Sequence, residues 1–191
     1  EDLVNHYTYV IAGDGCLMEG ISHEAASLAG HLKLGKLIVL FDDNGISIDG
    51  STSLSCSDDH IRRFESYGWQ TFQVDGHDPE AVESAIAAAR VDSSRPALIA
   101  CRTVIGFGSP NKQGTASTHG SPLGESEIAA AREELGWPHA PFEIPDDILQ
   151  AWRNIGRRGS ADADAWDERL AQAPEAKRQE FERRMQGDLP A

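Results

Sequence analysis

Residues 7–15 read YTYVIAGDG and residues 36–46 read KLIVLFDDNGI, and these two stretches decide the fold. In each of them an apolar, β-branched or aromatic run ends in glycine and acidic residues, which is typical of a strand followed by a turn. The second run is apolar throughout, as expected for a strand that is covered on both faces. Between the two runs, leucine and isoleucine recur at helical spacing up to Gly35, so we expect a helix there.

The same alternation continues further along the chain. We expect a short helix after Asp59, a strand over residues 70–74, a helix from Pro79 to Ala89 and a strand over residues 96–104. Strands and helices in this rhythm predict an α/β fold, in which a parallel sheet carries helices on both faces.

The rhythm stops after the last of these strands. Residues 106–124 (GFGSPNKQGTASTHGSPLG) form a long loop rich in glycine and serine, and loops of this length are usually functional or disordered. The remainder of the chain is charged and helical, with a flexible break expected over residues 156–160. We therefore divide the chain into an α/β domain, residues 1–140, and a helical C-terminal extension, residues 141–191.

The composition argues against several classes of protein. The 191 residues include 17 Lys and Arg against 31 Asp and Glu, which gives a net charge of −14. A surface this acidic repels phosphate backbones and anionic lipids, so we expect neither nucleic acid nor a membrane as a partner. A phosphorylated ligand would need a locally neutralised site, for example at a metal ion. Three cysteines without metal-type spacing indicate free thiols in a reducing compartment, and we expect a cytoplasmic protein.

Asp14 and Asn44 follow the two strands that decide the fold. Because the carboxyl ends of neighbouring parallel strands meet at one edge of a sheet, we expect the two residues side by side. A carboxylate, an amide oxygen and a turn carbonyl are the hard oxygen ligands that Mg²⁺ or Ca²⁺ prefers, and Mg²⁺ completes its shell with phosphate oxygens and water. The pair therefore predicts a metal bridge to a diphosphate. The alternative is that Asn44-Gly45 is only a turn and that Asp42 and Asp43 are solvated.

The sequence resembles the transketolase family at these same residues. Gly13-Asp14-Gly15 followed thirty residues later by Asn44 is the thiamine-diphosphate-binding motif, and residues 13–50 are similar to transketolase throughout. The resemblance continues through FESYGW, VDGHD, IGFGSPNKQGT, HGSPLG and APFEIP, and so covers essentially the whole chain. Related thiamine diphosphate enzymes share the GDG…N skeleton but lack EGISHEA and IGFGSPN.

The resemblance implies a role for each of several residues. Asp14, Asn44 and the main-chain carbonyl of Ile46 would bind a divalent metal, which is Mg²⁺ or else Ca²⁺ or Mn²⁺. Gly15 and Asn44 would contact the diphosphate of thiamine diphosphate. His119 matches the catalytic histidine that lies beside the diphosphate and the substrate.

Two further acidic residues and one departure from the family also bear on the site. Glu19 and Glu24 match residues near the interface of a homodimer, where they help to link the two active sites by proton relay. In the family a histidine often follows the Gly-Thr of the long loop, whereas here Ala116 follows Thr115. The electrostatics of the loop near the substrate are therefore expected to differ.

The activity that the resemblance implies is that of a transferase in the pentose phosphate pathway. It would move a two-carbon ketol unit from a ketose phosphate to an aldose phosphate, so its substrates would be sugar phosphates. A full transketolase has further segments before this one and a pyrimidine-binding domain after it, so residues 141–191 would lead toward that domain. We expect the isolated chain to be inactive. Two alternatives stay open: a dihydroxyacetone synthase with another acceptor, and a non-catalytic α/β module that binds a metal–phosphate ligand.

The other histidines carry less weight. His31 and His60 have no partner at a useful spacing and are expected at the surface. His77 lies in the turn DGHD, where we expect a local hydrogen bond rather than catalysis.

Overall fold

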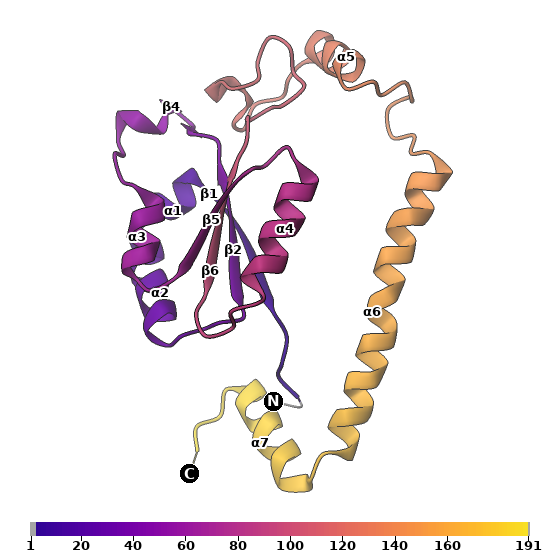
Figure 1. The fold of residues 1–191 in the computed structure, drawn as a ribbon. Coiled ribbons are helices and arrows are strands. Elements are labelled where there is room, and N and C mark those ends of the chain that lie inside the picture. Colours follow the sequence, from indigo (N-terminus) through magenta and orange to yellow (C-terminus); the bar gives the residue numbers. More distant parts are fainter. Residues whose placement is uncertain (1–2, 191) are drawn as a thin grey trace. The chain divides into compact units, whose positions relative to one another are not determined.

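The computed structural model describes residues 3–190, which divide into two compact units (Figure 1). One unit is residues 6–138, and the other combines residues 3–5 with residues 139–190.

A four-stranded sheet forms the centre of the unit of residues 6–138. Its strands are β1 (Thr8–Gly13), β2 (Leu37–Asp43), β5 (Gln70–Asp75) and β6 (Ala97–Arg102). They pair in the order β1-β2-β6-β5, and all three pairings are parallel. The expected α/β fold with a parallel sheet is confirmed. A small antiparallel hairpin that the sequence patterns did not predict, β3 (Ile46–Ser47) with β4 (Gly50–Ser51), follows β2.

Helices cover both faces of this sheet, as expected (Figure 1). On one side lie α1 (Asp14–Met18), α2 (Gly20–His31) and α3 (His60–Ser66), and on the other lies α4 (Pro79–Ala89). Alternate residues of β6 supply the two apolar clusters: Leu98 and Ala100 belong to one, and Ala97 and Ile99 to the other. A strand buried on both sides needs a continuous apolar sequence, which explains the composition of β6.

The single helix expected between β1 and β2 is wrong, because the structure has two helices there. The break falls at Glu19, whose extended backbone (φ −65°, ψ 137°) separates α1 from α2. Gly35 lies beyond the end of α2, where an added Cβ would overlap the carbonyl oxygen of Ser93. Glycine is therefore required at this position by the close approach of two backbone segments.

The apolar spacing along α2 also did not mark the buried face. Ala26 and Ala29 are buried against the sheet, whereas Ile21, Leu28 and Leu32 are all more than half exposed. Small side chains let the helix lie close to the strands, and the larger ones point away from them.

A long loop leads from β6 to α5 (Glu125–Glu134) and includes the short 3₁₀ helix η2 (Ala116–Thr118). The loop folds back on itself, because the Gly114 N–H donates to the carbonyl of Ile105 at 2.8 Å. Lys112 adds a second closure by donating from Nζ to the carbonyl of Leu123, also at 2.8 Å.

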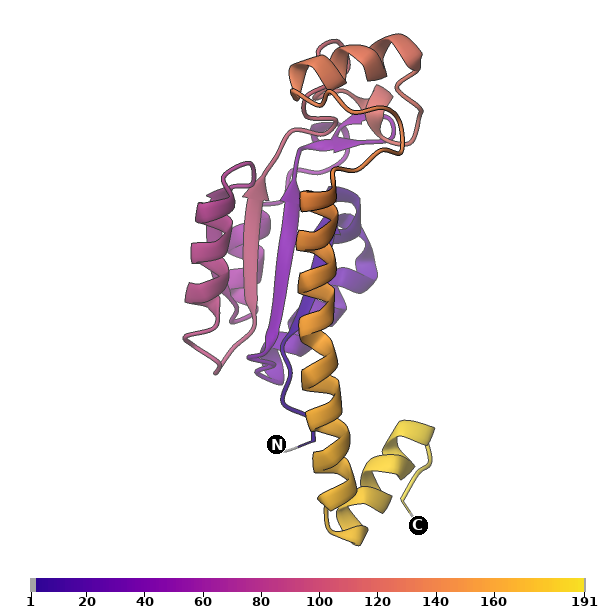
Figure 2. The same ribbon diagram turned by 90° about the vertical axis from the view of Figure 1, so that its right-hand side faces the viewer.

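The second unit contains α6 (Asp146–Gln172) and α7 (Glu175–Gln186) (Figure 2). The expected break over residues 156–160 is wrong, since α6 continues through both Gly156 and Gly159. A glycine within a helix costs only about 1 kcal/mol relative to alanine, and the surrounding residues include good helix formers. None of the described residues of α6 or α7 is buried.

One set of contacts joins the helices of this unit. The Trp166 ring lies edge-on to Phe181 with centroids 5.8 Å apart, and its indole N–H donates to the carbonyl of Leu3 at 2.8 Å. None of the helices described over residues 3–190 combines the length and apolar composition needed to cross a membrane.

Candidate functional site

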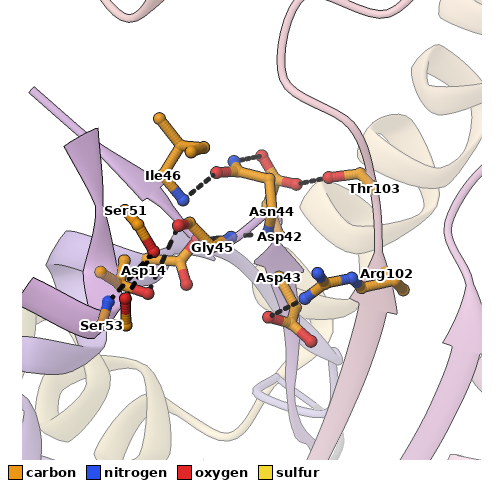
Figure 3. A network of polar contacts seen from close by, with 11 residues as sticks. Asp14, Asp42, Asp43, Asn44, Gly45, Ile46, Ser51, Ser53, Arg102 and Thr103 are labelled. Carbon is orange, nitrogen blue, oxygen red and sulfur yellow. Dashed lines mark hydrogen bonds and ion pairs between the residues drawn. The ribbon is translucent and has the colours of Figure 1, made fainter. Parts of the chain in front are cut away.

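The carboxyl ends of β1 and β2 meet at one edge of the sheet. Gly13 pairs with Asp42 in the parallel register, so the residues that follow each strand are neighbours. Oδ2 of Asp14 accepts hydrogen bonds from the backbone N–H groups of Asn44, at 3.2 Å, and of Gly45, at 3.1 Å (Figure 3). Asp14 and Asn44 thus lie side by side, as the parallel sheet predicted.

The environment of Asp14 makes its negative charge costly. The residue is only 6% exposed, and this burial raises the pKa of its carboxyl above the ordinary value of 3.8. The N–H donors of Gly45 and Asn44 oppose the rise in pKa without cancelling it. A carboxylate in which desolvation outweighs hydrogen bonding is one that a bound cation would stabilise.

The side-chain amide of Asn44 is held from two sides (Figure 3). Its Oδ1 accepts from the backbone N–H of Ile46 at 2.9 Å, and its Nδ2 donates to Oδ2 of Asp42 at 3.3 Å. The other oxygen of Asp42 accepts a short hydrogen bond from Oγ1 of Thr103, just after β6. One polar network therefore links residues that follow or end three different strands.

The alternative interpretation, in which Asn44-Gly45 is only a turn, is partly right. Gly45 has φ +71°, a conformation that favours glycine, and it leads into the hairpin. Asp42 and Asp43 are nevertheless not simply solvated: both are half-buried, and Asp43 pairs with Arg102 at 3.1 Å. A turn and a polar site therefore coexist in the same residues.

The chemistry of the donor set fits a hard divalent cation. Among residues 3–190 no group of three or more His, Cys, Asp and Glu side chains could hold a metal. A cation here would therefore use mixed oxygen donors, namely the Asp14 carboxylate, the Asn44 amide oxygen and the Ile46 carbonyl, together with ligands from a diphosphate or water. An added Cβ at Gly15 would meet no heavy atom of the described residues within 4 Å, so protein packing there does not require glycine. Space beside Gly15 is consistent with a ligand that approaches the backbone closely.

The remaining residues singled out from the sequence are exposed. His119 directly follows η2, and its backbone N–H donates to the carbonyl of Ala116 at 3.0 Å. Within residues 3–190, the structure shows no hydrogen bond from its side chain to Asp14 or Asn44. Glu19 and Glu24 are also exposed, and neither forms a hydrogen bond or ion pair through its side chain with the described residues. Their functional assignments stay predictions.

A cavity connects the long loop with the edge of the sheet. Its volume is about 780 Å³, and Asn44, the ends of β5 and β6 and Gly114 of the loop line it. The loop that carries His119 therefore starts at the same edge as Asn44, as expected for a segment that follows a parallel strand.

Two other histidines take part in the packing of this unit. His77 forms the local hydrogen bond expected in its turn, because its backbone N–H donates to Oδ1 of Asp75 at 2.9 Å. Its side chain also makes a contact that was not expected: Nε2 accepts from the N–H of Val104 at 2.9 Å, and the ring stacks on Phe107. His60 is not a surface residue, because it is half-buried and packs edge-on against Phe41 with centroids 5.2 Å apart. Burial lowers the pKa of His60, and no spacing in the sequence indicated this tertiary contact.

Sequence reasoning missed a buried carboxylate at the base of the loop. Glu127, in the first turn of α5, is 6% exposed and accepts from Ser109 Oγ at 2.5 Å. It also accepts from the backbone N–H of Asn111 at 2.9 Å and from its Nδ2 at 3.0 Å. These hydrogen bonds lower the pKa of Glu127 to about 2. The sequence did offer one indication of this contact: an acidic residue in the first turn of a helix, directly after a loop rich in hydrogen-bond donors.

Comparison with known proteins is consistent with this geometry. The family described as "Transketolase, thiamine diphosphate binding domain" matches residues 1–190. Transketolase 1 of Vibrio cholerae is 57% identical over 194 residues, which cover 100% of this chain and 29% of that protein. A solved transketolase from Leishmania mexicana is similar with a TM-score of 0.89 and 44% identity, over 99% of this chain and 29% of that one.

A second solved structure is informative about ligands. It is a transketolase from Pichia stipitis in complex with sedoheptulose 7-phosphate, similar with a TM-score of 0.87 and 40% identity. The match covers 98% of this chain and 28% of that chain. The chain thus spans less than a third of the length of the relatives that it matches.

Proposed function

The chain belongs to the transketolase family, and from this premise we propose that it holds the diphosphate and the divalent metal of thiamine diphosphate at the carboxyl ends of β1 and β2. The observation that carries the proposal is the buried carboxylate of Asp14, which two backbone N–H groups of the next strand end hold in place. Its charge is poorly compensated by the protein, and a cation would supply the missing compensation.

Each proposed contact follows from the chemistry of the residue. The carboxylate of Asp14, the amide oxygen of Asn44 and the carbonyl of Ile46 would bind Mg²⁺, which Ca²⁺ or Mn²⁺ would replace. Gly15 and Asn44 would contact the diphosphate. The chain carries a net charge of −14, so the metal would also neutralise the diphosphate in an otherwise repulsive surrounding.

We assign to the full-length protein the transfer of a two-carbon ketol unit from a ketose phosphate to an aldose phosphate. Thiamine diphosphate, when bound, supplies the carbanion chemistry of this transfer, and the present residues bind and orient it. His119 would donate a hydrogen bond to a phosphate or substrate oxygen at the same edge of the sheet. The sugar phosphate bound to the Pichia stipitis relative supports this class of substrate.

The assembly and location of the protein are part of the same proposal. Glu19 and Glu24 would lie near the interface of a homodimer and relay protons between its two sites. The exposure of both carboxylates leaves them available to a second subunit. The three cysteines are free, which suits a reducing cytoplasm.

Titration of the full-length protein with Mn²⁺ and thiamine diphosphate tests the proposal, with free Mn²⁺ followed by electron paramagnetic resonance. Asp14→Asn should lose metal-dependent binding of the cofactor. Asp92→Asn is the matched control: Asp92 also accepts a backbone N–H, that of Ser94 at 3.0 Å, but it precedes β6 and so lies toward the opposite end of the sheet.

The outcomes separate the proposal from its alternatives. Metal-dependent cofactor binding that survives in Asp14→Asn would contradict the assigned site. Cofactor binding without any ketol transfer would favour a non-catalytic module. Transfer only to an acceptor other than an aldose phosphate would favour a dihydroxyacetone synthase.

A further inference from the structure

The side-chain amide of Asn44 can adopt only one orientation in its surroundings. Its Oδ1 faces the N–H donor of Ile46 and its Nδ2 faces the carboxylate of Asp42 (Figure 3). Turning the amide by 180° would place its NH₂ group against an N–H and its oxygen against a carboxylate, so both contacts would become repulsive. The two neighbours therefore define which end of the amide holds the oxygen.

Asp42 is itself held by Thr103, the residue that follows strand β6. β2 and β6 pair in parallel with Asp42 opposite Cys101 and Asp43 opposite Arg102, so Thr103 comes one residue beyond that ladder. The backbone N–H of Thr103 continues the pairing by donating to the carbonyl of Asp43 at 3.2 Å. Its Oγ1 donates to Oδ1 of Asp42, and an ionised carboxylate has no proton to offer in return.

We propose that Asp42 and Thr103 are positioning residues for the metal, an inference that rests on the function proposed above. Thr103 fixes the carboxylate of Asp42, and Asp42 fixes the amide of Asn44. The amide then keeps Oδ1 on the side of Ile46, whose carbonyl is another proposed ligand. Oδ1 uses one lone pair for the Ile46 N–H and retains a second for the cation.

Neither residue needs to touch the cation for this effect. Partners that orient a metal ligand typically account for 10–100-fold in metal affinity. An amide that is free to rotate would present NH₂ to the cation for part of the time, and that orientation is repulsive. The residue that follows β6 thereby takes part in the site, although this segment supplies none of the proposed ligands.

Thr103 separates this positioning role from a plain effect of charge. Asp42 carries a negative charge, so its removal would weaken cation binding even if it oriented nothing. Thr103→Val leaves every charge in place and removes only the hydroxyl that holds Asp42. Thr103→Ser keeps the hydroxyl and is the conservative variant expected to restore binding.

The experiment measures the dissociation constant of Mn²⁺ in the full-length protein at saturating thiamine diphosphate, by electron paramagnetic resonance. Thr103→Val should raise that constant roughly tenfold, and Thr103→Ser should restore it. Thr71→Val is the matched control, because Thr71 Oγ1 also donates to a carboxylate, that of Glu65 at 3.1 Å, away from the site. It should leave the constant unchanged. The melting temperature of each metal-free variant reports whether the fold is intact.

Asp42→Ala should raise the same constant by up to roughly 100-fold. If Asp42→Ala does not fold, the comparison of Thr103→Val with Thr103→Ser is sufficient to test the positioning role. The positioning role is overturned if the Mn²⁺ dissociation constant of Thr103→Val equals that of the wild type. It is also overturned if Thr103→Ser shows the same increase in that constant as Thr103→Val.

Asn44→Ala distinguishes this inference from the proposed function. Wild-type Mn²⁺ binding in Asn44→Ala would overturn the metal site itself, and the positioning role with it. Binding lost in Asn44→Ala but unchanged in Thr103→Val would leave the proposed metal site standing and overturn only the positioning role.

Discussion

Asp14 and Glu127 are two carboxylates with the same exposure, 6%, and opposite electrostatic behaviour. Burial raises the pKa of Asp14, whereas hydrogen bonds from Ser109 and Asn111 lower the pKa of Glu127 to about 2. Asp14 accepts from two backbone N–H groups of the next strand end, and Glu127 accepts from a hydroxyl, a side-chain amide and a backbone N–H. The dominant influence therefore differs between the two groups: it is desolvation for Asp14 and hydrogen bonding for Glu127.

The comparison distinguishes a binding group from a structural one. Glu127 has its charge satisfied by the loop, so its task is to hold residues 109–111 against α5. The charge of Asp14 is not fully compensated by hydrogen bonds, and the amide oxygen of Asn44 lies nearby, so a cation would stabilise the Asp14 carboxylate.

The largest effect is expected for Asp14→Asn in the full-length protein. Metal-dependent binding of thiamine diphosphate and ketol transfer should both fall below detection, because the charged ligand is gone. The metal-free protein should be at least as stable as the wild type, since a neutral amide carries no penalty for a buried charge. Calorimetric titration and thermal unfolding without metal measure the two results. A large loss of stability in the metal-free variant would mean that Asp14 is structural, like Glu127.

His119→Ala tests the loop that Glu127 holds. We expect kcat/KM to fall roughly 10²–10³-fold, the usual size for the loss of one donor at a reacting oxygen. The fold should be unaffected, because His119 is exposed. Steady-state kinetics and circular dichroism measure both, with Ser117→Ala, an exposed residue of the same loop, as the control. Kinetics near those of the wild type would remove His119 from the site.

Glu127→Gln should loosen the loop without abolishing the binding of metal. The substitution weakens three hydrogen bonds that a charge now strengthens, so the Asn111 amide should exchange with solvent roughly tenfold faster. Hydrogen exchange followed by mass spectrometry over residues 105–124 measures this. The control is Glu125→Gln, an exposed residue in the same turn of α5. Equal rates of hydrogen exchange in the two variants would show that Glu127 does not hold the loop against α5.

The smallest effect is on the pH dependence of stability, where the two carboxylates should have opposite signs. The pKa of Glu127 falls from 4.5 to about 2 on folding, so its contribution is complete above about pH 4.5 and is lost as the pH falls toward 2. The pKa of Asp14 rises from 3.8, so in the metal-free protein stability decreases as the pH rises through the folded pKa.

Urea unfolding of the metal-free protein at a series of pH values measures both signs. Glu127→Gln should lose less stability than the wild type on acidification, and Asp14→Asn should lose more. If the free energy of unfolding depended on pH in the same way in both variants, Asp14 and Glu127 would not differ in the sign of their contribution.

Much of the fold and part of the site were predictable from local patterns. The apolar runs before Asp14 and Asp42 predicted two parallel strands, and Pro79 marked the start of α4. The structure adds the cap of that helix, Asp78, whose side chain accepts hydrogen bonds from the N–H groups of Glu80 and Ala81. The break of the helix at Glu19 was not predictable, because the spacing of leucines continues across it. That spacing pointed to a face that the structure leaves exposed, since close packing on the sheet selected alanines instead.

Local patterns were enough to predict the parallel sheet and the edge at which Asp14 and Asn44 meet, because strand periodicity and the residues at strand ends are local properties of the chain. The partners of each polar group, in contrast, depend on the tertiary fold. Thr103 reaches Asp42 across 61 residues of sequence, and Glu127 reaches Ser109 across 18. Burial and long-range hydrogen bonds determine whether the charge of a carboxylate is already compensated or can bind a cation. Neither can be predicted from the spacing of residues along one strand or helix.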